Sequence, residues 1–328
     1  MIRLRCACLG VLLLGGACGR GEQAPAPSST PQKTVATPYD EARRLLEQGQ
    51  PDAALAVLGS VSAPSAESLY LQGAAWAKKA ETAPLPTPPP LPSPLPRGYS
   101  PAPAPEFKEA ELTALSFLEQ AVGAEANHAR AHQAIADLLA PHAIRRAELR
   151  KAPAGHARGK RGKPEPPSAS AAAAGPDPSV ERVLREYQLA MTADPVALAP
   201  VEALIAFCEQ AGRTTEAEAA FSELQKRDRE KPEPFVRYGD FLKARRDFPG
   251  AIDQYRQALM WKADDEQTKM KIGEIYIAMA EEHLARQEYG AATERLNDAA
   301  KWVKDKNSPA GIKLQADLAT LAQIRRGR

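Results

Sequence analysis

The residues of this chain that are best suited to metal or nucleophilic chemistry are few, and their spacing does not suit it. His128 and His132 are four residues apart, so a helix would place both on one side, yet the His-Glu-x-x-His pattern of a zinc hydrolase is absent. Gly-x-Ser-x-Gly and a glycine-rich nucleotide fingerprint are absent too. The glycine–lysine pairs at 159–160 and 162–163 lack the gap and the hydroxyl residue of a phosphate loop. We therefore expect no enzyme activity, no cofactor and no metal.

The four cysteines also favour binding over catalysis. Cys6, Cys8 and Cys18 lie at the very start of the chain, and only Cys208 lies within a helical pattern. Cys208 occupies a position that later segments fill with large apolar residues, so we expect it to act as a small buried hydrophobic residue. No internal disulfide is expected.

The elements that remain are helices, and the segment 232–265 shows their plan. Its first half carries an apolar stripe at helical spacing, and its second half carries another after a break at 248–250. The stripes are Phe235, Tyr238, Gly239 and Leu242, then Ala251, Tyr255 and Ala258. Such a pair of helices cannot bury both stripes alone, so it needs copies on either side.

Copies follow at a constant period. Ala251 lies 34 residues after Ala217, which lies 34 residues after Val183. The residues expected to pack the repeats together are Val183, Tyr187, Ala190, Leu204, Ala217, Phe221, Tyr238, Gly239, Ala251, Tyr255, Ala258, Gly273, Tyr276 and Ala292. In the last pair the marker Ala292 comes 41 residues after Ala251, which predicts that both helices lengthen by about a turn.

This pattern resembles the tetratricopeptide-repeat family over residues 179–303. The resemblance implies an all-α fold, a right-handed α-solenoid of stacked helix-turn-helix repeats. Helices are also expected at 39–48, 52–60, 66–80, from 107, and at 129–140. A final helix at 309–325 is expected to cap the stack.

The first residues have the pattern of an export signal. Arg3 and Arg5 precede a short apolar run and small residues before Cys18. The stretch resembles a bacterial lipoprotein signal, which implies lipidation of Cys18, although Gly15 stands where that family usually has Leu or Val. Ordinary cleaved secretion and an uncleaved anchor are the alternatives. Without residues 1–17 the 43 basic and 41 acidic residues of the chain become equal in number, so the mature chain is neutral.

Proline marks the expected boundaries, because the 30 prolines cluster. The predicted organisation is a signal at 1–17, a lipid-anchored flexible tether at 18–38, degenerate repeats at 39–140 interrupted by a Pro-rich insertion at 83–105, a basic Pro/Ala-rich disordered insertion at 141–178, regular repeats at 179–306, and a capping helix at 307–328. Both insertions fall between the two helices of a pair, so they are expected to leave the stack at one edge. The first is either a polyproline ligand or spacer, or disordered filler.

The second insertion is basic. Residues 141–163 carry a net charge of +7, which favours contact with anionic lipid, with a solvated linker as the alternative. No aromatic residues are interleaved, so no nucleic-acid binding is expected.

The family resemblance also implies a binding groove lined by the first helices of the pairs. The implied groove residues are Tyr70, Arg130, Gln133, Asp137, Glu202, Glu209, Val236, Asp240, Lys243, Met270, Glu274 and Ile277. In the regular repeats, Lys243 is the one cation at the groove positions, against the five carboxylates of Glu202, Glu209, Glu233, Asp240 and Glu274. The groove is therefore predicted to be mildly acidic and to suit a peptide of basic character. The alternative is that these are solvated helix faces.

These observations together predict an envelope-anchored scaffold that binds a partner protein through its groove. The chain is similar to bacterial tetratricopeptide lipoproteins that assist assembly of outer-membrane, pilus or secretion complexes. Export to the periplasm is expected, on the outer rather than the inner membrane, since Gly19 and not Asp follows Cys18. The alternative is an envelope-organising protein that binds cell wall or anionic lipid through its Pro-rich and basic arms.

Overall fold

The computed structural model describes residues 37–84, 107–151 and 177–326, and within these ranges it contains thirteen helices and no strand. The predicted signal, tether, lipidation site and most of both insertions lie outside the described residues. The helices are α1 (Pro38–Glu47), α2 (Pro51–Gly59), α3 (Ala66–Thr82), α4 (Glu109–Ala124), α5 (Ala129–Lys151), α6 (Pro178–Ala193), α7 (Ala199–Ala211), α8 (Thr214–Arg227), α9 (Glu233–Ala244), α10 (Phe248–Trp261), α11 (Glu266–Ala285), α12 (Tyr289–Trp302) and α13 (Pro309–Arg326).

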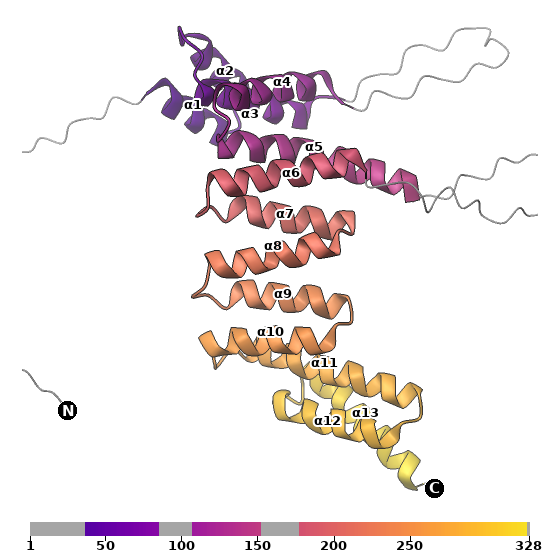
Figure 1. Cartoon of the computed structure of the whole chain (residues 1–328). Helices are drawn as coiled ribbons and strands as arrows, with labels where there is room; N and C mark the ends of the chain where they lie inside the picture. Colours follow the sequence, from indigo (N-terminus) through magenta and orange to yellow (C-terminus); the bar gives the residue numbers. More distant parts are fainter. Residues whose placement is uncertain (1–36, 85–106, 152–176, 327–328) are drawn as a thin grey trace, which may run out of the picture. The chain divides into compact units, whose positions relative to one another are not determined.

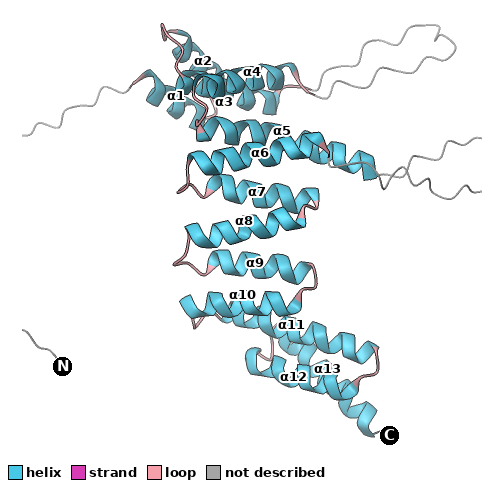
Figure 2. Cartoon of the chain, viewed as in Figure 1, coloured by secondary structure: helices cyan, strands magenta, loops and turns pink. Residues whose placement is uncertain are grey.

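The helices pack in chain order as antiparallel pairs (Figures 1 and 2). The first helices of the pairs are α1, α3, α5, α7, α9 and α11, and each packs against the second helix that follows it. Each second helix in turn packs against the next first helix, and α13 packs against both α11 and α12. The predicted all-α solenoid with a terminal helix is therefore confirmed.

Local sequence explains where the helices start and stop. In α10, the Asp247 carboxylate accepts a 3.1 Å hydrogen bond from the backbone N–H of Gly250 and so caps the first turn. At the other end of a helix, Gly212 takes φ 71° and ends α7 in the left-handed conformation that glycine adopts without steric cost. Both devices hold the turns between helices short.

The 34-residue period corresponds to one structural position. Val183, Ala217 and Ala251 are all 0 % exposed, each in the second helix of its pair. Most of the other expected packing residues are buried as well, while Tyr238 is half-buried; the buried ones are Tyr187, Ala190, Leu204, Phe221, Gly239, Tyr255, Ala258, Gly273, Tyr276 and Ala292. The equal surroundings of the three markers show that the period comes from stacking of equivalent helix pairs.

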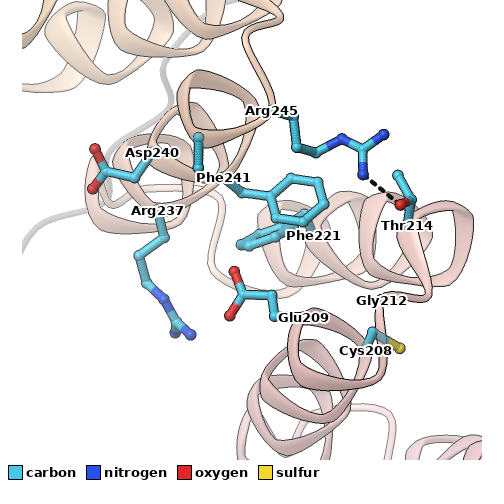
Figure 3. A pocket seen from close by; sticks show the side chains of 10 residues that line it. Cys208, Glu209, Gly212, Thr214, Phe221, Arg237, Asp240, Phe241 and Arg245 are labelled. Atoms are coloured by element: carbon cyan, nitrogen blue, oxygen red, sulfur yellow. Dashed lines mark hydrogen bonds between the residues drawn. The ribbon is translucent and has the colours of Figure 1, made fainter. Parts of the chain in front are cut away.

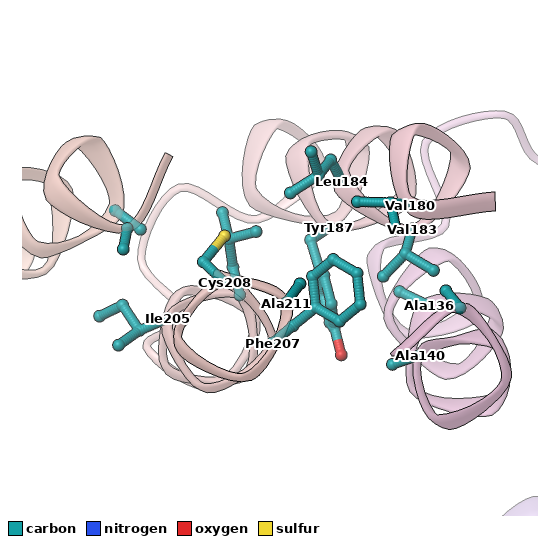
Figure 4. Packing of buried hydrophobic residues seen from close by; sticks show 14 of the residues in the cluster. Ala136, Ala140, Val180, Val183, Leu184, Tyr187, Ile205, Phe207, Cys208 and Ala211 are labelled. Carbon is teal, nitrogen blue, oxygen red and sulfur yellow. The ribbon is translucent and has the colours of Figure 1, made fainter. Parts of the chain in front are cut away.

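The largest apolar cluster runs from α4 to α8. In Figure 4 the Tyr187 ring lies between the helix that carries Ala136 and Ala140 and the helix that carries Phe207. Further along, the Phe221 ring stacks on Tyr238 with centroids 5.0 Å apart. This contact joins the cluster to a second one spanning α9 to α13.

Two glycines allow a close approach of paired helices. A Cβ atom on Gly239 would lie 2.5 Å from Cε1 of Tyr255, and one on Gly73 would lie 2.6 Å from Cγ of Leu118. Both contacts join the first and second helices of a pair. The glycine in the repeat pattern is therefore required by packing.

The predicted start of the second insertion at residue 141 is wrong. Helix α5 continues through Pro141 to Lys151. A proline inside a helix costs about 3 kcal/mol. The contacts of later residues offset this cost. Ala143 is buried, and Ile144 packs against the main cluster. The ring centroids of His142 and Phe107 lie 4.1 Å apart.

The prediction that both helices of the last pair lengthen is also wrong. Helix α11 has 20 residues against 12 in α9, whereas α12 and α10 both have 14. The extra turns of α11 carry Ala280, which is fully buried in the cluster that includes Leu314 and Leu321 of α13. Packing on α13 therefore explains why the first helix takes the extension. Among the helices that the structure describes, none has both the length and the apolar character needed to cross a membrane.

Candidate protein-binding face

One side of the first helices forms a surface of equivalent positions, called here the first-helix face. At one such position Tyr70, Gln133, Val236 and Met270 are half-buried, and Glu202 is exposed. The next equivalent set, Ala74, Asp137, Ala206, Asp240 and Glu274, follows one turn later on the same helices. The implied groove residues thus come from comparable places in successive pairs.

Three clefts in the described part of the chain lie on this face between successive first helices. They occupy about 450 Å³ between α1 and α3, about 660 Å³ between α5 and α7, and about 500 Å³ between α7 and α9. Equivalent residues line them, namely Leu71, Ala203 and Arg237, then Ala74, Ala206 and Asp240, then Lys78, Gln210 and Ala244. The clefts are therefore a repeated feature of the fold.

The α5/α7 cleft has an apolar floor. Its lining includes Ala140, Ala203, Ala206 and Phe207, with Arg145 and Glu148 toward one end. Asp137 also lines it and accepts a 2.7 Å hydrogen bond from the Tyr187 hydroxyl. Desolvation by the groups packed around it raises the pKa of the Asp137 carboxyl, against the effect of this hydrogen bond. Burial also raises the pKa of Tyr187.

The α7/α9 cleft combines aromatic and charged groups. Phe221 and Phe241 lie next to each other at its centre, with ring centroids 5.2 Å apart, and Arg245 lies at the edge bonded to Thr214 (Figure 3). Glu209 also lines the cleft, and its side chain is exposed to solvent. This cleft can accept a polar or aromatic group.

Between α9 and α11, two ion pairs occupy the position that a cleft takes between the preceding first helices. Lys271 Nζ lies 2.5 Å from Oδ2 of Asp240, and Lys243 Nζ lies 2.6 Å from Oε2 of Glu274. Asp240 also accepts a 2.6 Å hydrogen bond from Tyr255. Burial raises the pKa of Tyr255, and hydrogen bonding to Asp240 adds to the effect.

The predicted acidic character of the groove is wrong for three of its five carboxylates. Glu202 pairs with Arg237 at 2.9 Å, while Asp240 and Glu274 pair with Lys271 and Lys243. Arg237 and Lys271 lie at a helix position that the family resemblance does not assign to the groove. Stacking brings these cations to the carboxylates of the neighbouring helix.

Ile277, predicted to line the groove, is 1 % exposed and lies inside the core. It shares an apolar cluster with Leu314 and Leu321 of α13, the helix that packs against α11. The terminal helix therefore covers this end of the face. Val236 and Met270 remain half-buried and pack against the same cluster.

The remaining implied groove residues lie at the N-terminal end of the stack. Tyr70 and Arg130 line the α1/α3 cleft, and burial raises the pKa of Tyr70. Gln133 is half-buried on α5.

The candidate chemical groups are engaged in the structure. The thiol of Cys208 is 1 % exposed, and burial raises its pKa to about 12, which keeps it protonated. His132 Nδ1 lies 2.7 Å from Glu186, and His128 Nε2 lies 3.2 Å from Glu67. Within the ranges described, no cluster of three potential metal ligands occurs.

Sequence reasoning missed Arg237, Lys271 and Ala203. The signal was available, because Ala203, Arg237 and Lys271 follow one another at the 34-residue period. The pattern does not show which carboxylate each cation pairs with, because that depends on the offset between stacked helices.

No family model matches this chain, and no curated protein matches it. Several solved structures are similar. The MamA RS-1 ArsTM double mutant is 12 % identical over 69 % of this chain and 93 % of its own, with a TM-score of 0.40. TTC0263, a thermophilic TPR protein of Thermus thermophilus, is 14 % identical over 73 % and 96 %, with a TM-score of 0.37. PilF of Pseudomonas aeruginosa is 12 % identical over 85 % and 96 %, with a TM-score of 0.42.

Proposed function

We propose that this tetratricopeptide-repeat chain is a lipid-anchored scaffold of a bacterial envelope that binds a segment of a partner protein on its first-helix face. The partner is held at the periplasmic side of the outer membrane, where the scaffold assists assembly of an outer-membrane, pilus or secretion complex. The repeat architecture supports a scaffold role, because helix pairs recur with fully buried equivalents at Val183, Ala217 and Ala251.

The observation that carries the binding role is the row of equivalent clefts between first helices. An extended or helical segment of a partner can place one side chain per repeat into such a row. The exposed Glu209 and Gln210 and the half-buried Ala203 offer polar and apolar contacts along the way. The proposed anchoring rests on the sequence of residues 1–38, with the basic head, apolar run and Cys18.

Site-specific photo-crosslinking in intact cells tests the binding role. A photo-reactive residue is placed at Gln210 on the first-helix face or, as a matched control, at Gln257, an exposed glutamine of the second helix α10. We expect one discrete crosslinked partner from position 210 and none from position 257. Equal crosslinking from both positions, or none from 210, contradicts the proposal.

A further inference from the structure

The clefts of the first-helix face differ in one respect that points to a ligand. At the α9/α11 junction four residues form the two bridging ion pairs, Asp240, Lys243, Lys271 and Glu274. The residues at the same positions of the α5/α7 cleft are Asp137, Ala140, Ala203 and Ala206. Three charged side chains are thus replaced by alanine, and the one that stays is the aspartate.

The surroundings of the two aspartates are otherwise alike. Tyr255 donates to Asp240 at 2.6 Å, and Tyr187 donates to Asp137 at 2.7 Å. Both tyrosines lie four residues after a marker position of their second helix. The α5/α7 cleft therefore contains an aspartate bonded to a tyrosine, as the α9/α11 site does, but not the lysine that pairs with that aspartate.

Asp137 lacks a cationic partner among the residues that the structure describes. Its carboxylate accepts a 2.7 Å hydrogen bond from the hydroxyl of Tyr187, which is uncharged. Arg145 and Glu148 also line the cleft, but they have opposite charges and lie two and three turns further along α5. Asp137 is exposed to solvent at the cleft, where a partner can reach it, and desolvation by the groups around it raises the pKa of its carboxyl.

The cleft offers what the rest of a lysine side chain needs. Ala140, Ala203, Ala206 and Phe207 provide apolar surface for an aliphatic stem, and the volume of about 660 Å³ leaves room for it. In the occupied site, Lys271 Nζ also lies 5.8 Å from the ring centroid of Tyr255, and Tyr187 presents the equivalent ring to the α5/α7 cleft.

We propose that the α5/α7 cleft binds a lysine side chain of the partner segment, with its ammonium group on the Asp137 carboxylate in the place that Lys271 takes on Asp240. This inference rests on the proposed function and names the chemistry that the partner must bring to it. The chain itself shows that a lysine complements an aspartate at this position, because its own Lys271 pairs with Asp240 in the equivalent site.

Two variants isolate the site. Asp137→Asn keeps an oxygen that accepts the Tyr187 hydrogen bond but removes the charge. Ala203→Lys places the chain's own cation where Lys271 stands in the equivalent site, so that it occupies the cleft. Asp253→Asn, at an exposed residue of α10, is the matched control for loss of one carboxylate.

The probe is an array of random ten-residue peptides, incubated with the full chain in detergent. We expect bound peptides to be enriched in lysine at one position relative to the rest. Affinity for those peptides should fall at least about tenfold in both Asp137→Asn and Ala203→Lys, and stay unchanged in Asp253→Asn.

A second measurement needs no ligand. Thermal unfolding should show coupling between the two sites, with Asp137→Asn lowering Tm more in the Ala203→Lys background than alone. Peptide binding without lysine enrichment, or unaffected by both variants, overturns this inference and leaves the proposed function standing. No peptide binding at all, together with failed crosslinking from position 210, overturns both.

Discussion

The Tyr255 hydroxyl of α10 donates a 2.6 Å hydrogen bond to the Asp240 carboxylate of α9, so the core of this pair is tied directly to its binding face. The Tyr255 ring is 0 % exposed, whereas Asp240 lies at the α7/α9 cleft. Tyr187 and Asp137 repeat the relationship two pairs earlier. Phe221 stands at the tyrosine position of the pair between them, where the partner position is Ala206. Hydroxyl and carboxylate thus occur together or not at all among these three pairs.

Removing the hydroxyl should weaken the fold. Tyr255→Phe leaves the ring in place but takes away one donor to Asp240, so we expect the free energy of unfolding to fall by about 1–2 kcal/mol. Urea denaturation measures it. Tyr238→Phe is the control, because the half-buried Tyr238 stacks on Phe221 through its ring, which the substitution keeps. Equal losses in the two variants would contradict the assigned bond.

Replacing Gly239 by alanine should destabilise the fold, whereas replacing Gly123 by alanine should not. Gly239→Ala puts a Cβ within 2.5 Å of the buried Tyr255 ring, and we expect a loss of about 1–3 kcal/mol of stability. A Cβ atom on Gly123 of α4 would project into open space, with no neighbouring group within 4 Å. Gly123→Ala should therefore be neutral or stabilise by up to about 1 kcal/mol. Thermal unfolding of both variants measures this difference in stability.

Arg227 should be one of the most sensitive charged residues. Its guanidinium donates to the backbone carbonyls of Met191, Asp194 and Ala197, and so joins α8 to the end of α6 and the loop beyond. Arg227→Met leaves these carbonyls without their donor, and we expect a loss of about 2–4 kcal/mol. Arg227→Lys should recover only part, since an ammonium cannot span three acceptors in the same geometry. Arg229→Met, on the exposed surface nearby, serves as the control in the same denaturant titration, and a loss as large as that of Arg227→Met would refute the claim.

Acid should weaken the contact between Arg213 and Glu216. The hydrogen bond from Arg213 lowers the pKa of Glu216, so this pair stabilises the fold above the carboxyl's unfolded pKa of about 4.3. The stabilisation is lost as pH falls through the lower, folded pKa. Glu216→Gln should lower the free energy of unfolding by about 0.5–1 kcal/mol at pH 7. It should have no effect at a pH where Glu216 is protonated in both the folded and the unfolded protein. In an Arg213→Met background the pH dependence of the difference should disappear, which denaturation from pH 7 to pH 2 measures.

The anchor has its own test. Cys18→Ser removes the residue that the signal pattern marks for lipidation, and we expect the protein to leave the membrane fraction. Fractionation of cells that express the variant measures this. Cys208→Ser is the matched control and should stay with the membrane, because Cys208 is buried in α7. A Cys18→Ser variant that remains in the membrane fraction argues against the lipid anchor.

Some elements could be predicted because their signals are local and periodic. The apolar stripes of α9 and α10 and the glycine at 239 follow from helical spacing within about 30 residues. The break between the two helices lies at 245–247 and not at the predicted 248–250, because Pro249 is accommodated in the first turn of α10. The failure at Pro141 has a different cause. A proline is a local signal for a helix end, but Ala143 and Ile144 find partners in the main cluster, and that burial depends on residues far away in the chain.

The sequence by itself determined the helix pairs, their 34-residue period and the residues that bury between them, because these follow from short-range geometry that the chain repeats. Only the tertiary structure decided that Lys271 reaches Asp240, that α13 covers Ile277, and that Asp137 faces an open cleft. Each of these depends on the offset between helices of different pairs. That offset is set by the packing of many side chains at once, which no single stretch of sequence contains.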